Sequence, residues 1–318
     1  MGEIVTVRQA KFFDFEALRD AVQDAQSDIV QIEQGKMTGM VTHLAIDSVG
    51  ASVGDFTRGV RQRGELSPDR WTFGFVEKPA QVCYYDMAPG DLFLLAPGNE
   101  LYSSFSGANG YTTVFVKPDE LFAFIAGEPG AQDAAAWHQP ASLLTGQGTA
   151  VARELSALLA GLAEHGPKMS PEIAGYHKND VLELITALVL EGSADRYRSP
   201  RLSHQSAVEL VRDVERFMIG AGARPVSVSE LVKHFGVPRR SLFSAFEDVL
   251  GVSPMQFSRR KRLGDAHSAL LMAMPGDTVD RIRTEHGFLD GGRFAKSYHS
   301  QFGEWPHETL LRPRHRWV

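Results

Sequence analysis

Residues 278–306 read TVDRIRTEHGFLDGGRFAKSYHSQFGEWP, and their pattern indicates the architecture of the last third of the chain. The spacing of Val279 and Ile282 predicts a short helix that ends before a turn at Gly287. Apolar residues then recur at helical spacing from 292 to 302 and predict a second helix. Two helices joined by a tight glycine turn form a helix-turn-helix. The outer side of the second helix would carry Arg293, Lys296, Ser297 and Ser300.

A similar arrangement occurs at residues 227–250. Ser227 and Glu230 have the spacing of a capping box, which opens a short helix that Gly236 can end. Pro238 suits the start of the following helix. The apolar face of that helix would consist of Leu242, Phe246, Val249 and Leu250, and its opposite face of Arg239, Arg240, Ser244 and Glu247. Arginines at the N-terminal end of a helix in the major groove can meet guanine edges or phosphates, although the same face could also be a solvated charged surface.

A longer, basic helix is predicted between the two motifs. It begins at Ser253-Pro254 and carries the basic run RRKR at 259–262, followed by apolar residues at helical spacing. Such a helix can hold the two motifs at a fixed separation.

With this helix in place, residues 207–314 resemble the DNA-binding domain of AraC/XylS-type transcription regulators. The matching segments are Leu242-Phe243-Ser244-Ala245-Phe246, Leu250-Gly251-Val252-Ser253-Pro254, Arg262-Leu263 with Ala266, and Gly287-Phe288-Leu289-Asp290 with Phe294, Tyr298, Phe302-Gly303 and Pro306. The resemblance implies two recognition helices on one face that enter successive major grooves of double-stranded DNA, about 34 Å apart. The residues expected to bind DNA are Arg239, Arg240, Ser244, Arg293, Lys296 and Ser297.

The sequence departs from the family pattern at two positions. Arg283 stands where the family usually has a small residue at the crossing of the two short helices, which puts the packing of the second motif in question. Pro238 replaces the more usual serine, which removes a side-chain cap but keeps a favourable helix start.

The first 117 residues predict antiparallel β structure, because short apolar runs alternate with turn residues. The runs are Met40 to Ile46, Trp71 to Val76, Gln81 to Tyr85, Leu92 to Leu95 and Thr112 to Val116. Pro89-Gly90 and Pro97-Gly98 form tight turns, and their close spacing predicts a small barrel or sandwich. Together with Phe56-Thr57-Arg58, these segments resemble the cupin-like ligand-binding domains that are fused to many of these regulators.

Two amphipathic helices follow, separated by Gly166-Pro167. Their apolar positions are Val151, Leu155, Leu158, Leu159 and Leu162 in the first and Val181, Leu182, Ile185, Leu188 and Val189 in the second. Because this exceeds what one small barrel needs to cover it, at least one helix is expected to form a two-fold homodimer. The polar segment 192–205 is expected to be a linker.

The predicted fold class is α+β. A cupin-like antiparallel β-barrel that binds an effector would occupy 1–130, two linking and dimerising helices 131–195, and an all-α DNA-binding domain with two helix-turn-helix motifs 203–318.

The charge distribution separates the two ends of the chain. From Ser203 onward there are 17 Lys and Arg against 13 Asp and Glu, whereas the preceding residues hold 16 against 26. An acidic body joined to a basic end fits a sensor attached to a nucleic-acid-binding domain. No apolar run is long enough for a membrane span, and the single Cys83, in an apolar stretch, reads as a buried thiol, so we expect a cytoplasmic protein.

No catalytic or metal site is expected. The β region lacks the His-x-His pair of metal-binding cupins, and His43 is its only histidine before His138. The chain shows neither a phosphate-binding glycine loop nor a Ser/His/Asp signature, so we expect no cofactor and a protein that binds rather than catalyses. Two alternatives stay open: a metal-independent cupin-type enzyme with a DNA-targeting tail, and a protein-interaction module whose basic tail is only solvated.

Three arginines indicate what the β region binds. Arg58, Arg61 and Arg63 lie within six residues on or just after a predicted strand, and guanidiniums recognise carboxylates and phosphates. They predict a small anionic effector, such as an aromatic acid, a sugar acid or a nucleotide second messenger, for example the cyclic dinucleotide c-di-GMP. A solvated basic strand end is the alternative.

Overall fold

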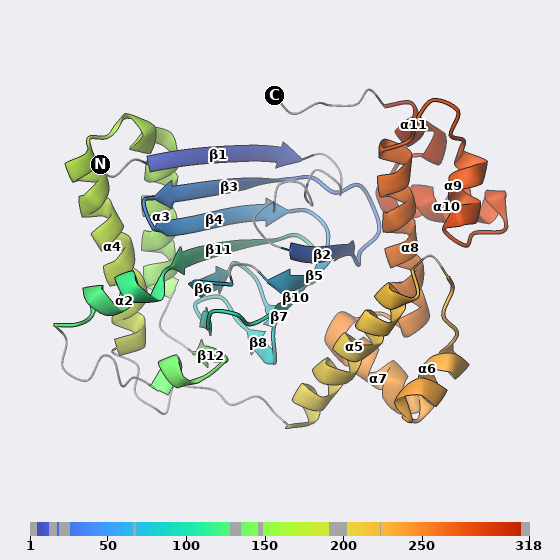
Figure 1. Ribbon diagram of the computed structural model, residues 1–318, viewed down its shortest axis with the longest axis horizontal. Helices are drawn as coiled ribbons and strands as arrows, with labels where there is room; N and C mark the ends of the chain where they lie inside the picture. The colour runs from blue at the N-terminus through green and yellow to red at the C-terminus, as the bar shows by residue number, and fades with distance from the viewer. Residues whose placement is uncertain are drawn as a thin grey trace.

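The structure is a computed structural model that describes residues 5–12, 18, 26–65, 68–127, 135–145, 149–190, 202–222 and 224–312. Figure 1 shows β-strands in the middle of the molecule, two long helices at one side and a group of long and short helices at the other. We refer to the described residues up to 190 as the N-terminal region and to 202–312 as the C-terminal region. The predicted linker lies mostly in 191–201, outside the described residues, and its last residues belong to helix α5.

Two antiparallel sheets form the N-terminal region. The seven-stranded sheet has the order β1 (Val5–Phe12), β3 (Gly39–Ile46), β4 (Val49–Phe56), β11 (Asn109–Val116), β6 (Trp71–Val76), β9 (Leu92–Leu95) and β12 (Ala141–Leu144). The five-stranded sheet has the order β2 (Gln26–Gln31), β5 (Val60–Glu65), β10 (Leu101–Phe105), β7 (Ala80–Val82) and β8 (Tyr85–Met87). The α+β class is confirmed, with the predicted runs at 71–76 and 92–95 found as strands.

The predicted strand from Gln81 to Tyr85 is wrong. The chain turns back at Cys83 and Tyr84, so that Val82 pairs with Tyr85 in a hairpin. Cys83 adopts a φ of 51°, which a run of apolar residues gives no reason to expect. Its thiol is buried as predicted, and burial raises the pKa of Cys83 to about 11.

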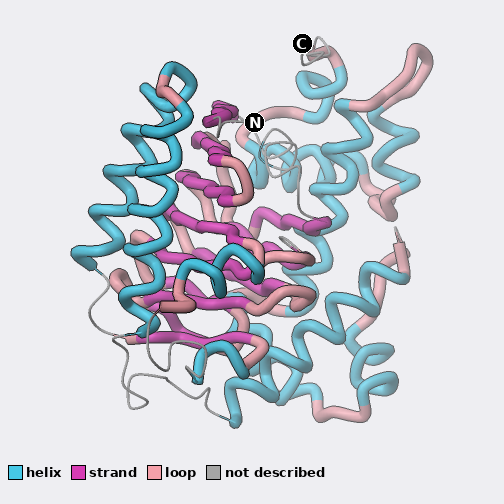
Figure 2. The backbone as a smooth tube through the Cα atoms, turned by 60° about the vertical axis from the view of Figure 1, so that its left-hand side comes forward, coloured by secondary structure: helices cyan, strands magenta, loops and turns pink. Residues whose placement is uncertain are grey.

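Helices α3 (Thr149–His165) and α4 (Pro171–Leu190) confirm the two predicted amphipathic helices. They cover one face of the seven-stranded sheet, as Figure 2 shows, with α2 (Pro118–Phe124) beside them. Their shared core includes Leu94, Val114, Leu121, Leu155 and Ile185. The apolar residues that suggested dimerisation are therefore largely used within the chain, apart from Leu188, whose side chain lies outside what the structure describes. Among the described side chains of α4, the large apolar ones that are exposed are Ile173 and Tyr176.

The C-terminal region is all helical. Its helices are α5 (Leu202–Gly220), α6 (Val228–Phe235), α7 (Arg239–Leu250), α8 (Pro254–Leu271), α9 (Val279–Glu285), α10 (Gly291–Phe302) and α11 (Pro306–Leu310). The turns of the two motifs contain Gly236 at φ 63° and Gly287 at φ 74°, where a side chain would be strained. Ser227 caps α6 by accepting a hydrogen bond from the Glu230 amide, but the Glu230 carboxylate pairs with Arg224 instead of completing the capping box.

The two regions share a core. Val30 and Ile32, from the strand and loop of β2, belong to the same apolar cluster as Val211 of α5 and Leu242 and Phe246 of α7. The C-terminal helices therefore pack directly on the five-stranded sheet, which lies on that side in Figure 1.

Candidate DNA-binding surface and effector cavity

Helix α7 exposes the basic residues predicted for it. Arg239 and Arg240 stand exposed at its N-terminal end, and the guanidinium of Arg239 lies 5.3 Å from the Phe243 ring centre. Exposed Ser244 lies one turn further on and donates to the Asp248 carboxylate at 3.2 Å. The N-terminal end of a recognition helix is the part that meets base edges, so this geometry suits the predicted contacts.

Helix α10 offers a second basic end. Asp290 caps it by accepting a hydrogen bond from the Arg293 amide at 2.8 Å, and this bond lowers the pKa of Asp290. Arg293 and Lys296 are exposed, whereas half-buried Ser297 donates to the Arg293 carbonyl and accepts from Arg259 of α8. Arg259 thus joins the surface of the second motif, although the sequence analysis recognised it only as part of a basic run.

Arg283 has a specific place in the second motif. Its guanidinium donates to the carbonyls of Phe288 at 2.5 Å and Leu289 at 2.9 Å, and it pairs with Asp280. A side chain on Gly291 would place its Cβ 3.3 Å from Arg283 Nε, a tight contact that the absence of a side chain avoids. The large residue at the helix crossing is therefore accommodated, and it ties the turn that positions α10.

A cavity of about 410 Å³ lies between the two sheets. Small residues of β3, β4 and β6 leave space on one side, among them Ala45, Gly50, Ser52 and Gly74. Phe93, Leu101 and Phe105 supply apolar walls. The volume falls within the range of small-molecule pockets, and most of the lining is apolar.

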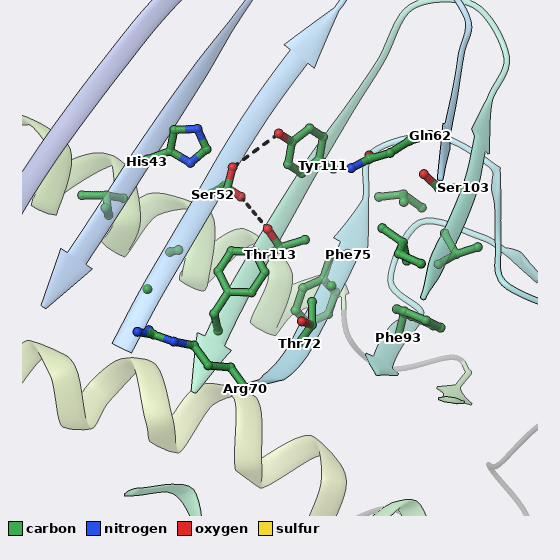
Figure 3. A pocket seen from close by; sticks show the side chains of 18 of the residues that line it. His43, Ser52, Gln62, Arg70, Thr72, Phe75, Phe93, Ser103, Tyr111 and Thr113 are labelled. Atoms are coloured by element: carbon green, nitrogen blue, oxygen red, sulfur yellow. Dashed lines mark hydrogen bonds between the residues drawn. The ribbon is translucent and has the colours of Figure 1, made fainter. Parts of the chain in front are cut away.

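Polar groups stand at separate places around this cavity (Figure 3). Ser52 Oγ lies 3.3 Å from the hydroxyl of Tyr111, whose pKa is raised by burial, so the phenol stays neutral. Arg70 lies at one end of the view and donates to the Ser48 carbonyl at 2.8 Å. At the other end is Ser103, which is 1% exposed and whose Oγ has no hydrogen-bond partner among the described residues. A buried hydroxyl without a partner is costly, and a ligand could satisfy it.

The three predicted effector arginines lie outside the lining of this cavity. Side chains alternate along a strand, and because Gln62 of β5 faces the cavity, its neighbours Arg61 and Arg63 face the other way. Arg61 forms a bidentate pair with Glu215 of α5 at 3.0 and 3.2 Å, and Arg63 pairs with Glu100 at 3.4 Å.

Arg58 donates to the carbonyl of Thr57 at 3.1 Å and lies against Gly35. The role of the three arginines in effector binding stays a prediction.

Two comparisons bear on the C-terminal helices. The model of a helix-turn-helix domain family matches residues 231–312, which include α7 and α10. The crystal structure of a probable AraC family transcriptional regulator from Rhodopseudomonas palustris CGA009 is 37% identical and has a TM-score of 0.32. The match covers 33% of this chain and 99% of that one.

The chain belongs to the AraC family.

Two other proteins match more of the chain at lower identity. The probable thc operon regulatory protein of Rhodococcus erythropolis is 30% identical over 51% of this chain. This chain spans about half of that relative, 50% of its length. The crystal structure of the AraC-like transcriptional activator CuxR is 15% identical, with a TM-score of 0.41, over 82% of this chain and 96% of that one.

None of the helices that the structure describes is both long and apolar enough to cross a membrane. The described His, Cys, Asp and Glu side chains form no group of three that could hold a metal ion.

Proposed function

We propose that this AraC-family chain is a transcription regulator that binds double-stranded DNA through α7 and α10. The observation that carries the proposal is the pair of exposed basic helix ends, Arg239 and Arg240 on one motif and Arg293 and Lys296 on the other. Neither end is covered by the N-terminal region, although that region packs closely on the same helices. The protein would act in the cytoplasm, where it meets its operator.

The DNA contacts are expected to differ in kind. Arg240→Ala should weaken binding to the preferred sequence by about 1–3 kcal/mol, because a bidentate arginine–guanine contact discriminates between bases. Lys296→Ala should weaken binding to all sequences alike and reduce its salt dependence, because a phosphate contact carries no sequence information. Duplexes selected by the protein from a random pool, titrated at several salt concentrations, would measure both effects. Unchanged affinity in both variants would exclude this surface.

We propose that the effector binds in the cavity between the sheets. An apolar body would pack against Phe93 and Leu101, an anionic group would approach Arg70, and a polar group would pair with Ser103. This combination suits a compact amphipathic anion, of which an aromatic acid is one example. Arg70 then takes the part expected of Arg58, Arg61 and Arg63. Of these, Arg61 and Arg63 pair with Glu215 and Glu100 at 3.0 and 3.4 Å, whereas the carboxylate nearest to Arg70, that of Asp69, is 3.8 Å away.

A thermal-shift screen of small anions would find such a ligand. A compound that binds only the folded protein stabilises it by about 2.7 kcal/mol at one hundred times its Kd. Arg70→Gln should remove most of the shift of an anionic hit, whereas Arg70→Lys should retain part of it. A hit whose shift is the same in wild type and Arg70→Gln would place the anion elsewhere.

We also propose that the chain forms a homodimer, through residues of α4 other than those suggested by the sequence. Leu155 is fully buried, so a charge there would damage the core instead of testing an interface. Ile173 and Tyr176 are 50% and 65% exposed on α4. Ile173→Glu with Tyr176→Glu should shift a dimer to monomer in sedimentation at micromolar concentration. A dimer that survives both changes would use another surface.

A further inference from the structure

Strands β5 and β10 line the cavity with one face and contact α5 with the other. In their antiparallel register Ser103 lies opposite Gln62, and both side chains line the cavity. The next pair along, Ser104 and Arg61, belongs to the opposite face because side chains alternate. A displacement of either strand therefore moves cavity groups and outer groups together.

The outer face of these strands holds the C-terminal region. Arg61 and Glu215 are 4% and 3% exposed, so their bidentate pair lies in the interface between β5 and α5. Beside it, Arg216 of α5 donates to the Glu100 carboxylate at 2.7 Å and to the hydroxyl of Tyr102 at 3.2 Å. Burial, together with the Glu100 carboxylate, raises the pKa of Tyr102 to about 12, so this hydroxyl stays protonated.

Further contacts reach both recognition helices. Gln81 donates to the Asp248 carbonyl at 3.0 Å, near the C-terminal end of α7. Gln31 Nε2 and the Gly35 amide donate to the Gln301 carbonyl at 2.9 and 3.1 Å, at the C-terminal end of α10. The N-terminal region thus holds both motifs by the ends opposite their basic residues.

We propose that β5 and β10 form the element through which cavity occupancy changes DNA binding, with the Arg61–Glu215 pair as the contact that transmits it. The inference rests on the proposed function, since it assigns regulation to the proposed ligand site. A ligand in contact with Gln62 and Ser103 favours one position of the two strands. That position sets how α5 docks, and docking sets the relative orientation of α7 and α10. Only a ligand with different affinities for two arrangements can shift their populations, and the shared strands provide that difference.

Reciprocal titrations test this coupling. The probe for the cavity is 1-anilinonaphthalene-8-sulfonate, a fluorescent aromatic anion, and the DNA is a duplex that the full chain selects from a random pool. In the wild type, saturating DNA should change the Kd of the probe by about fivefold or more, and saturating probe should change the Kd of DNA by the same factor. Gly74→Leu fills the cavity from β6, where an added Cβ makes only an ordinary contact with Thr113, and should abolish probe binding.

Three variants locate the coupling. Arg61→Ala leaves Glu215 unpaired and should bring the factor close to one while DNA and probe still bind. The double change Arg61→Met with Glu215→Leu removes both charges, restores an apolar contact and should recover the coupling. Lys178→Ala breaks a pair with Glu120 that is 2.9 Å long, joins α4 to α2 and is only 13% and 19% exposed, and it should leave the factor unchanged.

The possible results distinguish failure of the coupling through β5 and β10 from failure of the proposed function. If the Kd ratio is near one in the wild type, or if Arg61→Ala keeps the wild-type ratio, the coupling through β5 and β10 is wrong. The proposal that the chain is a DNA-binding regulator would still stand. Probe binding that is indifferent to Gly74→Leu overturns the ligand site, and with it the inference. Failure to select any DNA sequence overturns the proposed function itself.

Discussion

Replacing Arg61 with alanine is expected to lower the free energy of unfolding by about 3–5 kcal/mol, because a buried carboxylate then loses its cation. Glu215 is 3% exposed on its side chain, and both of its oxygens accept hydrogen bonds from the Arg61 guanidinium. Separation of α5 from β5 would let water reach the Glu215 carboxylate, and this rehydrates it at the lowest free-energy cost. The loss of stability should therefore weaken the packing between the two regions and should not be spread evenly over the whole chain.

Urea denaturation gives the size of this loss, and amide hydrogen exchange gives its location. Exchange should accelerate in β5, β10 and α5 of Arg61→Ala and stay slow in β6 and β9. The double change Arg61→Met with Glu215→Leu should recover the stability or exceed that of the wild type by about 1–4 kcal/mol, since two apolar side chains avoid the desolvation of two ions. If the single variant is as stable as the wild type, the pair does not hold the interface.

Tyr298→Ala is expected to cost about 3–5 kcal/mol, the range for removal of a buried aromatic side chain. Tyr298 is fully buried, and its ring packs between Phe294 and Phe302 in the core of the second motif. Its hydroxyl donates to Thr309 Oγ1 at 2.8 Å. Truncation would leave a cavity where α10 meets α8 and α11, so the second recognition helix would lose its orientation.

Tyr298→Phe is the matched control. It keeps the ring and removes one hydrogen bond, which is worth about 1 kcal/mol, and Thr309 keeps a further bond to Glu304 at 2.6 Å. DNA affinity should fall steeply in Tyr298→Ala and little in Tyr298→Phe. Equal loss in the two variants would assign the effect to the hydroxyl and contradict a packing role.

The double helix-turn-helix could be predicted because its determinants are local. Gly236 and Gly287 mark turns with positive φ, and apolar residues at helical spacing mark the faces. The pairing of Glu230 with Arg224 was missed because two partners compete for one carboxylate, and sequence does not rank them. The sequence put the packing around Arg283 in question. Its hydrogen bonds could not be predicted, because the acceptors are the backbone carbonyls of Phe288 and Leu289, which have no sequence signature.

The β region was predictable only where its strands contain several large apolar residues. β4 escaped notice because Gly50, Ser52 and Gly54 stand where an apolar strand face would have large side chains. Gly50 and Ser52 line the cavity. The small residues that leave space for a ligand therefore also remove the apolar alternation by which a strand is predicted. The arginines of β5 predicted a ligand-binding strand. The partner of Arg61 is Glu215 of α5, which is far away in sequence, so this pair could not be predicted without the fold.

The shared core of the two regions has a consequence for how the protein is made. Val30 and Ile32 belong to the cluster that surrounds Phe246 of α7, yet they leave the ribosome long before that helix is synthesised. Domains generally fold as they emerge, from the N-terminus onward. The nascent N-terminal region thus carries an uncovered apolar strip at β2 until α5 and α7 arrive. We therefore expect the first DNA-binding motif to complete its folding against β2 during translation.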